Sequence, residues 1–284
     1  MKDKILDYAQ LVKVRLSFLV VFSAAMSYLW ASNRQTDALV IWLLSVGGFF
    51  ITASSNILNQ IIERESDRLM KRTMNRPLAA GRMSIGEAIT LASFLGITGI
   101  FLLFQINLLA AVLGAIAMLI YAALYTPLKR VTALTIIPGA VAGSLPVVIG
   151  WVASTGAIER EAVILFLVQF AWQFPHTWSI AWLLNDEYNK AGLKMLPTSE
   201  KNNTSALLIM ISTFLIIPSA LLFYMYESAG FHVMWILVLA GLGMAALAYR
   251  HYRVQTDKTA VKLMLSCFAY LPLVLIILVV EKFL

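Results

Sequence analysis

Residues 38–58 of this chain read ALVIWLLSVGGFFITASSNIL, a run of 21 positions without a charged side chain. A helix of about 20 mainly apolar residues crosses the roughly 30 Å of hydrocarbon in a bilayer. The chain holds nine segments of this kind, namely Leu16–Ser32, Ala38–Leu58, Gly86–Phe104, Leu108–Leu124, Leu134–Val152, Ala162–Leu184, Ala206–Tyr224, Val233–Tyr249 and Leu263–Val280. Because long apolar runs take the place of the alternation that a β-barrel requires, we expect an all-α bundle of nine transmembrane helices.

The composition supports a polytopic membrane protein. The chain is 60% hydrophobic and 13% charged, and its mean hydropathy is +0.81, whereas soluble domains average roughly 45–50% apolar and about 25% charged residues. Nine spans occupy about 180 residues, so residues 1–284 are expected to form a single integral-membrane domain. One cysteine, Cys267, excludes an intramolecular disulfide and a cysteine-built metal site.

The distribution of basic residues predicts the orientation. With the N-terminus in the cytoplasm and the C-terminus outside, the cytoplasmic segments hold nineteen Lys and Arg residues and the opposite side holds three. Short cationic loops resist translocation, so this asymmetry is a strong positive-inside signal. The basic loops need no nucleic-acid partner. The first fifteen residues predict an interfacial helix before a retained span, not a cleaved signal peptide, and without a transit-peptide pattern a bacterial inner membrane is the expected location.

A charged segment follows the second span and reads NQIIERESDRLMKRTMNRP over residues 59–77. If the helix continues through it, Asn59, Glu63 and Asp67 recur at i, i+4 and i+8 and share one face. Mg²⁺ favours one or two carboxylates together with phosphate oxygens of a substrate. The basic residues that follow are suited to clamp those phosphates; they are Arg68, Lys71, Arg72 and Arg76. The alternative is a solvated loop whose acids and bases pair with one another.

Two further polar segments are predicted on the same side of the membrane. Asp186 and Glu187 follow the sixth span, and a second carboxylate set there is suited to a second Mg²⁺ on a diphosphate leaving group. Tyr125 and Lys129 flank Pro127 at the end of the fourth span, where the proline is expected to end the helix and turn the basic residue toward the same rim. An ordinary polar loop and positive-inside anchoring are the respective alternatives.

The sixth span contains the sequence WQFPH over residues 172–176. His176 is the only histidine inside a predicted span, and intramembrane histidines face the interior of a bundle. It is a candidate to bind a metal or a porphyrin iron or to shuttle protons, with Trp172 beside it. The alternative is a packing histidine near the kink that Pro175 introduces. In the fifth span, Gly139, Gly143 and Gly150 are predicted to permit close helix approach.

Together these segments resemble the intramembrane prenyltransferases of the UbiA superfamily, and within it the protohaem IX farnesyltransferase family. The resemblance runs from about Tyr8 to Pro197. Asn59, Glu63 and Asp67 match the first aspartate-rich motif, and Tyr125 with Lys129 matches the tyrosine-to-lysine motif. The most diagnostic match is the stretch from Trp172 to His176 and its continuation to Pro197. The family usually has Asp where this chain has Glu63, Glu65 and Glu187, so each carboxylate here reaches one methylene farther.

This resemblance implies farnesyl transfer from farnesyl diphosphate to a vinyl group of haem b, with hydration, to give haem O. It implies catalytic roles for one set of residues, Asn59, Glu63, Asp67, Tyr125 and Lys129. Mg²⁺ is the implied cofactor, with Glu63, Asp67, Asp186 and Glu187 as its ligands. Haem b is a substrate, with His176 and Trp172 as candidate haem-binding residues. Haem A synthase or terminal-oxidase assembly factors are the expected protein partners.

Two other functions fit parts of this pattern. A prenyltransferase acting on an aromatic quinone precursor such as 4-hydroxybenzoate needs Asn59, Glu63 and Asp67 but has no use for His176. A nine-span transporter is less suited, because transporters place such charges near the bilayer midplane and here they gather at one rim.

Overall fold

All nine predicted spans fold as helices in the computed structural model, which describes residues 2–283 and contains no strand within that range. The elements are α1 (Lys2–Leu11), α2 (Val14–Ala31), α3 (Ala38–Ile62), α4 (Arg64–Leu69), α5 (Ile85–Phe104), α6 (Leu108–Leu119), a π-helix (Ile120–Tyr125), α7 (Thr126–Leu128), a 3₁₀ turn (Ala133–Thr135), α8 (Ile136–Thr155), α9 (Arg160–Leu183), α10 (Asn185–Lys190), α11 (Asn203–Phe214), α12 (Ile216–Met225), α13 (Phe231–Val254) and α14 (Asp257–Phe283). The predicted interfacial helix before the first span corresponds to α1.

Two predicted spans are not single α-helices. The fourth runs through α6, the π-helix and α7, and the seventh is divided at Leu215 between α11 and α12. Pro218 lies in the first turn of α12 and has no N–H to give to the carbonyl of residue 214, so the helical hydrogen bonding breaks just before it.

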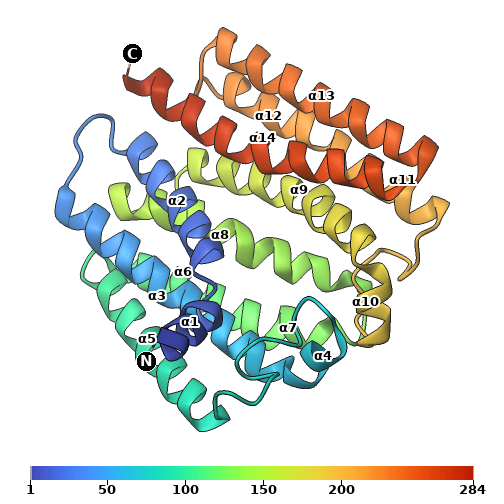
Figure 1. The fold of residues 1–284 in the computed structure, drawn as a ribbon. Coiled ribbons are helices and arrows are strands. Elements are labelled where there is room, and N and C mark those ends of the chain that lie inside the picture. The colour runs from blue at the N-terminus through green and yellow to red at the C-terminus, as the bar shows by residue number, and fades with distance from the viewer. Residues whose placement is uncertain (1, 284) are drawn as a thin grey trace.

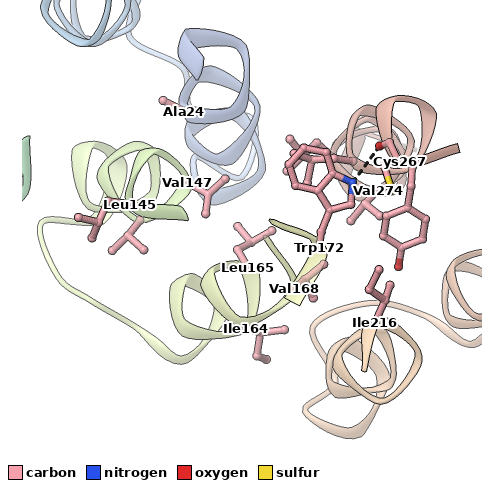
Figure 2. Close-up of a cluster of buried hydrophobic side chains, with 14 of the residues drawn as sticks. Ala24, Leu145, Val147, Ile164, Leu165, Val168, Trp172, Ile216, Cys267 and Val274 are labelled. Atoms are coloured by element: carbon pink, nitrogen blue, oxygen red, sulfur yellow. Dashed lines mark hydrogen bonds between the residues drawn. The ribbon is translucent and has the colours of Figure 1, made fainter. Parts of the chain in front are cut away.

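Eight of the nine spans in the described part of the chain are long and apolar enough to cross a membrane, and α9 is long enough but too polar to join them. Gln169, Gln173 and His176 lower its hydropathy. Instead of facing lipid on all sides, α9 packs against α8, α11, α12 and α14. Figure 2 shows Trp172 of α9 directed toward α14, where its indole nitrogen donates to the Cys267 carbonyl at 2.8 Å.

Helix α8 comes very close to its neighbours, as its glycines predict. A Cβ at Gly150 would overlap the carbonyl of Ala24 on α2, and one at Gly143 would overlap the side-chain amide of Gln173 on α9. Ser27 of α2 also donates to the Val147 carbonyl of α8 at 2.6 Å. Helix α8 therefore lies close to α2 and α9 in the middle of the bundle, an approach that only small residues allow.

The short helices α4, α7 and α10 lie at one end of the bundle, with the C-terminus at the other end (Figure 1). This end, called here the α4–α10 end, gathers the charged segments that follow α3, the π-helix and α9. The lipid-facing sides of the long helices carry exposed apolar residues, such as Phe94 and Ile97 on α5. The fold is that of a multi-pass membrane protein with its polar groups collected at one rim.

Candidate active site

Helix α3 ends sooner than the predicted continuous helix, but Asn59, Glu63 and Asp67 still share one face. Glu63 follows Ile62 with φ −91° and ψ 6°, and α4 starts one residue later. The backbone nitrogens of Glu63 and Asp67 still donate to the carbonyls of Asn59 and Glu63, at 2.9 and 2.8 Å. Because the i to i+4 bonds continue through the junction, Asn59, Glu63 and Asp67 all face the same cavity.

This polar cavity has a volume of about 130 Å³ and lies at the α4–α10 end. Its wall combines four basic and two acidic side chains with an amide and three tyrosines. The lining residues are Lys13, Asn59, Glu63, Asp67, Met70, Arg72, Arg76, Tyr121, Tyr125, Lys129, Tyr188, Leu193 and Met195. The excess of positive over negative side chains makes it a site for an anion.

Both carboxylates of the polar cavity are paired with a base. Arg76 holds Asp67 through one nitrogen that lies 2.9 and 2.7 Å from the two carboxylate oxygens. The Lys129 ammonium lies 2.9 Å from Oε1 of Glu63, and both side chains are 10% exposed or less. Burying two such pairs is costly unless other groups complete their coordination. The arrangement is therefore typical of a site that is completed by a bound ligand.

The donor set fits Mg²⁺ bound together with a phosphate. Oε1 of Glu63 is buried without a hydrogen-bond partner, although the Lys129 ammonium lies 2.9 Å away. Among residues 2–283 no group of three or more His, Cys, Asp or Glu side chains is placed to enclose a metal ion. Mg²⁺ is usually held by one or two carboxylates, water and substrate phosphates. The two carboxylates of the polar cavity, Glu63 and Asp67, are compatible with that protein share.

The pKa values reflect a crowded site in which charged groups are largely buried. Desolvation, together with the charges of Arg76 and Lys129, lowers the pKa of Lys13 to about 7. Burial raises the pKa of Asp67 despite the opposing charge of Arg76. Burial acts in the same direction on Glu63, but the charges of Lys129 and Lys13 and the polar groups around the carboxylate together outweigh it and hold the pKa of Glu63 below its ordinary value. A polyanion and a divalent cation would each favour the charged forms of these groups.

Asn59 connects the carboxylate-bearing segment to the neighbouring helix. Its side-chain nitrogen donates to the Thr126 hydroxyl at 3.2 Å, and its oxygen accepts from the Lys13 ammonium at 3.2 Å. Thr126 in turn donates its hydroxyl to the Tyr121 carbonyl at 2.8 Å. Asn59 thus fixes the position of a base on one side and of the π-helix on the other.

The π-helix brings two tyrosines to the same place. Tyr121 and Tyr125 both line the polar cavity, with ring centroids 5.3 Å apart. The Thr126 N–H also reaches the Tyr121 carbonyl, five residues back, which is the hydrogen bond that defines a π-turn. The Lys129 ammonium lies 4.3 Å from the centroid of the Tyr125 ring. Pro127 does not end the helix where the sequence predicts, since α7 runs to Leu128.

A second, larger cavity adjoins the first and is mainly apolar. This apolar cavity has a volume of about 340 Å³ and is lined by residues of α2, α3, α8, α9 and α14. Tyr121 and Tyr125 belong to the walls of both cavities. Some lining residues, Leu16 and Leu19 of α2 and Phe268 of α14, are also exposed on the outside of the bundle, so the cavity reaches the lipid-facing surface there.

Trp172 and His176 line the apolar cavity together. Their rings are stacked, with centroids 4.4 Å apart and an angle of 16° between planes, and Phe268 meets the histidine edge-on at 5.0 Å. Nδ1 of His176 is buried without a hydrogen-bond partner. An unpaired imidazole nitrogen in an apolar wall leaves a donor or acceptor unsatisfied, which favours a ligand that supplies the missing partner.

Not every residue predicted for the site reaches these cavities. Arg68 pairs with the exposed Glu65 at 2.9 Å and donates to the Ala79 carbonyl, so it supports the following loop. Lys71 and Asp186 are exposed and line neither cavity. Glu187 lies just outside the polar cavity, where it accepts from the backbone nitrogen of Arg72 at 3.3 Å. Glu187 thereby connects α10 to the segment that follows α4.

Two site residues had no distinct signal in the sequence. Lys13 reads as one of several cytoplasmic bases, but a left-handed backbone (φ 48°, ψ 58°) between α1 and α2 places it in the cavity wall. Tyr121 precedes Tyr125 by four residues, a spacing that indicates a shared face. The spacing does not show that this face lines the polar cavity, which the structure reveals.

Comparisons with known proteins identify the family of this chain. The model of the UbiA prenyltransferase family matches residues 20–271. A protohaem IX farnesyltransferase from Flavobacterium johnsoniae is 44% identical over 289 aligned residues, covering 100% of this chain and 96% of that protein. One from Cytophaga hutchinsonii is 41% identical over 277 residues, covering 97% of each.

Solved structures share the fold. A digeranylgeranylglyceryl phosphate synthase superposes with a TM-score of 0.83 over 99% of both chains at 21% identity. A UbiA homologue from Archaeoglobus fulgidus bound to GPP and Mg²⁺ superposes with a TM-score of 0.74, covering 96% of this chain and 99% of that one, at 14% identity.

Proposed function

Because this chain belongs to the UbiA prenyltransferase family and is a membrane prenyltransferase, we propose that it transfers farnesyl from farnesyl diphosphate to a vinyl group of haem b. Water is added in the same overall reaction, which gives haem O and releases diphosphate. The names of its relatives support this donor and acceptor.

The observation that carries the proposal is the pair of adjoining cavities. A prenyl diphosphate has a charged, water-soluble head and a long apolar tail, and the two cavities offer each part a suitable environment. The head would occupy the polar cavity beside Lys13, Arg72 and Arg76, and the tail would extend past Tyr121 and Tyr125 into the apolar cavity. The reacting carbon then lies where the two cavities meet.

The basic residues of the polar cavity bind and stabilise the diphosphate. When bound to Glu63 and Asp67, Mg²⁺ would neutralise negative charge on the diphosphate and favour its departure. Arg76 and Lys129 are already fixed by their carboxylate partners at 2.7 and 2.9 Å, so they would meet the developing charge without rearrangement. Asn59 holds Lys13 and Thr126 in place for the same purpose.

The transfer itself takes place where the polar cavity meets the mainly apolar one. The bond between C1 of the farnesyl group and the diphosphate oxygen breaks, and its electron pair leaves with the oxygen. The vinyl group of haem attacks C1 to form the new carbon–carbon bond, and water adds to the remaining cationic carbon and loses a proton to the released diphosphate. His176 and Trp172, whose stacked rings line the apolar cavity, would orient the porphyrin.

The same proposal includes the location. The N-terminus would face the cytoplasm of a bacterium and the chain would span its inner membrane, so that the polar cavity opens toward soluble farnesyl diphosphate. Haem A synthase or terminal-oxidase assembly factors would receive the product.

The test is mass analysis of pigments from purified membranes incubated with haem b, farnesyl diphosphate and Mg²⁺. We expect a new haem that is heavier by a farnesyl group and water, and that is absent from membranes carrying the double variant Glu63→Gln/Asp67→Asn. If haem b stays unmodified while 4-hydroxybenzoate becomes prenylated, the haem acceptor is refuted and a quinone-pathway enzyme is supported. If neither acceptor is prenylated, transport becomes the function to test.

A further inference from the structure

We propose that Tyr121 is a further catalytic residue, whose ring stabilises the allylic cation at the junction of the two cavities and keeps it from water. The inference rests on the proposed prenyl transfer and concerns the step in which the farnesyl–oxygen bond breaks. The first observation is position: Tyr121 contributes to the wall of both cavities, so its ring lies at the point where head and tail of the substrate meet.

The second observation is how the chain places this ring. Leu108 and Leu119 of α6 are exposed on the outside of the bundle, so this face of α6 is turned away from the site. A π-turn holds one more residue than an α-turn, which rotates the segments on either side by about 100° relative to a regular helix. The turn at Ile120–Tyr125 thus lets a helix facing lipid present Tyr121 together with Tyr125 to the site.

The third observation separates Tyr121 from its neighbour. Tyr125 already has the Lys129 ammonium 4.3 Å from its ring centroid, and a Cβ at Gly139 would lie 2.7 Å from the same ring. No protein cation lies over the Tyr121 ring in the described part of the chain. Its π-system is therefore available to a cation supplied by the substrate. The π-turn that orients it is itself held by Thr126 and Asn59.

The chemistry gives this ring two effects. When the C1–O bond breaks, the electron pair goes to the diphosphate and C1 becomes part of an allylic cation, which the face of an aromatic ring attracts. If water instead of the vinyl group attacks C1, a carbon–oxygen bond forms, the proton passes to the released diphosphate and the product is farnesol. A ring at the junction favours ionisation and also blocks the path of water from the polar cavity.

The experiment compares Tyr121→Phe and Tyr121→Leu in the full-length protein purified in detergent, with Mg²⁺, haem b and labelled farnesyl diphosphate. It measures diphosphate release and the ratio of farnesol to farnesylated haem. Tyr121→Phe keeps the ring, and we expect both quantities to stay within about threefold of wild type. Tyr121→Leu removes the π-system, and we expect release to fall about 10- to 30-fold while the farnesol share rises.

Tyr249→Leu is the matched control, because it makes the same change at an exposed tyrosine on α13. We expect wild-type rate and product ratio from it. The proposal is overturned if Tyr121→Leu retains both quantities, if Tyr121→Phe loses as much as Tyr121→Leu, or if Tyr249→Leu shows the same loss.

A second series keeps the proposal testable if the leucine variant does not fold. Phenylalanine carrying one, two or three ring fluorines at position 121 preserves the shape while weakening the attraction of the ring for a cation. We expect release to decline with each fluorine, and a flat series contradicts the proposal. A wrong haem assignment can be told apart from a wrong role for Tyr121. Diphosphate release and farnesol report ionisation even where no farnesylated haem forms.

Discussion

The buried ion pair between Glu63 and Lys129 allows a quantitative test of how the polar cavity is held together. Its charged atoms are 2.9 Å apart, and the side chains are 7% and 10% exposed. At an effective dielectric constant of about 20, such charges attract by about 6 kcal/mol before the cost of desolvation is counted. Lys129→Met leaves a carboxylate buried without its partner, which typically costs about 3–5 kcal/mol. We expect Glu63→Gln to cost a similar amount.

The double variant Glu63→Gln/Lys129→Met removes both charges. We expect it to be more stable than the sum of the single losses predicts, by at least about 2 kcal/mol, because no unpaired charge remains. Farnesyl transfer should nevertheless be lost in all three variants, since both groups belong to the proposed site. The double variant should therefore regain stability relative to the single variants without regaining activity.

The assay is unfolding by titration with SDS in mixed micelles, followed through the fluorescence of the seven tryptophans. Lys201→Met is the control, because Lys201 and Asp257 form a more exposed pair of similar length, 3.1 Å. That pair should contribute less than about 1 kcal/mol. The reasoning is refuted if Lys129→Met costs no more than Lys201→Met, or if the double variant loses the full sum of the two single changes.

Three other predictions follow from the same contacts. Gly150→Ala should destabilise the protein by about 1–3 kcal/mol or more, because the new Cβ overlaps the Ala24 carbonyl, whereas Gly243→Ala has open space around it and should be neutral or slightly stabilising in thermal unfolding. His176→Ala should weaken haem binding at least about tenfold in a Soret titration, and equal haem affinity would remove His176 from the site. Chelation by EDTA should abolish transfer and added Mg²⁺ should restore it, and activity that survives exhaustive chelation would contradict the role given to Glu63 and Asp67.

The sequence predicts the architecture well, because hydropathy and charge act over whole segments. All nine apolar runs are helical, two of them divided into shorter segments, and the glycines of α8 are indeed at its closest contacts. The face shared by Asn59, Glu63 and Asp67 also followed from spacing alone. Local periodicity determines these features, and the structure changes them only slightly, as in the break at Glu63.

What the sequence does not predict depends on contacts between distant segments. Arg68 and Arg76 look alike in a basic run, but one turns outward to Glu65 and the other inward to Asp67. Lys13 lies in the site because its own backbone is left-handed, and no local sequence pattern predicts that conformation. Tyr121 depends on a π-turn that is fixed partly by Asn59, more than sixty residues earlier in the chain. Side-chain direction at the rim is therefore a tertiary property.

The polarity of α9 has a consequence for how the protein is made. This helix alone among the nine lacks the hydropathy to enter lipid by itself, and three of the helices that enclose it, α11, α12 and α14, are synthesised later. A nascent chain that ends before α11 would leave His176 without Phe268 and Trp172 without the Cys267 carbonyl, because both partners lie on α14. Stable insertion of α9 thus depends on the C-terminal helices, and truncation after residue 200 should direct the chain to membrane quality-control proteases even though every charged residue of the polar cavity is already present.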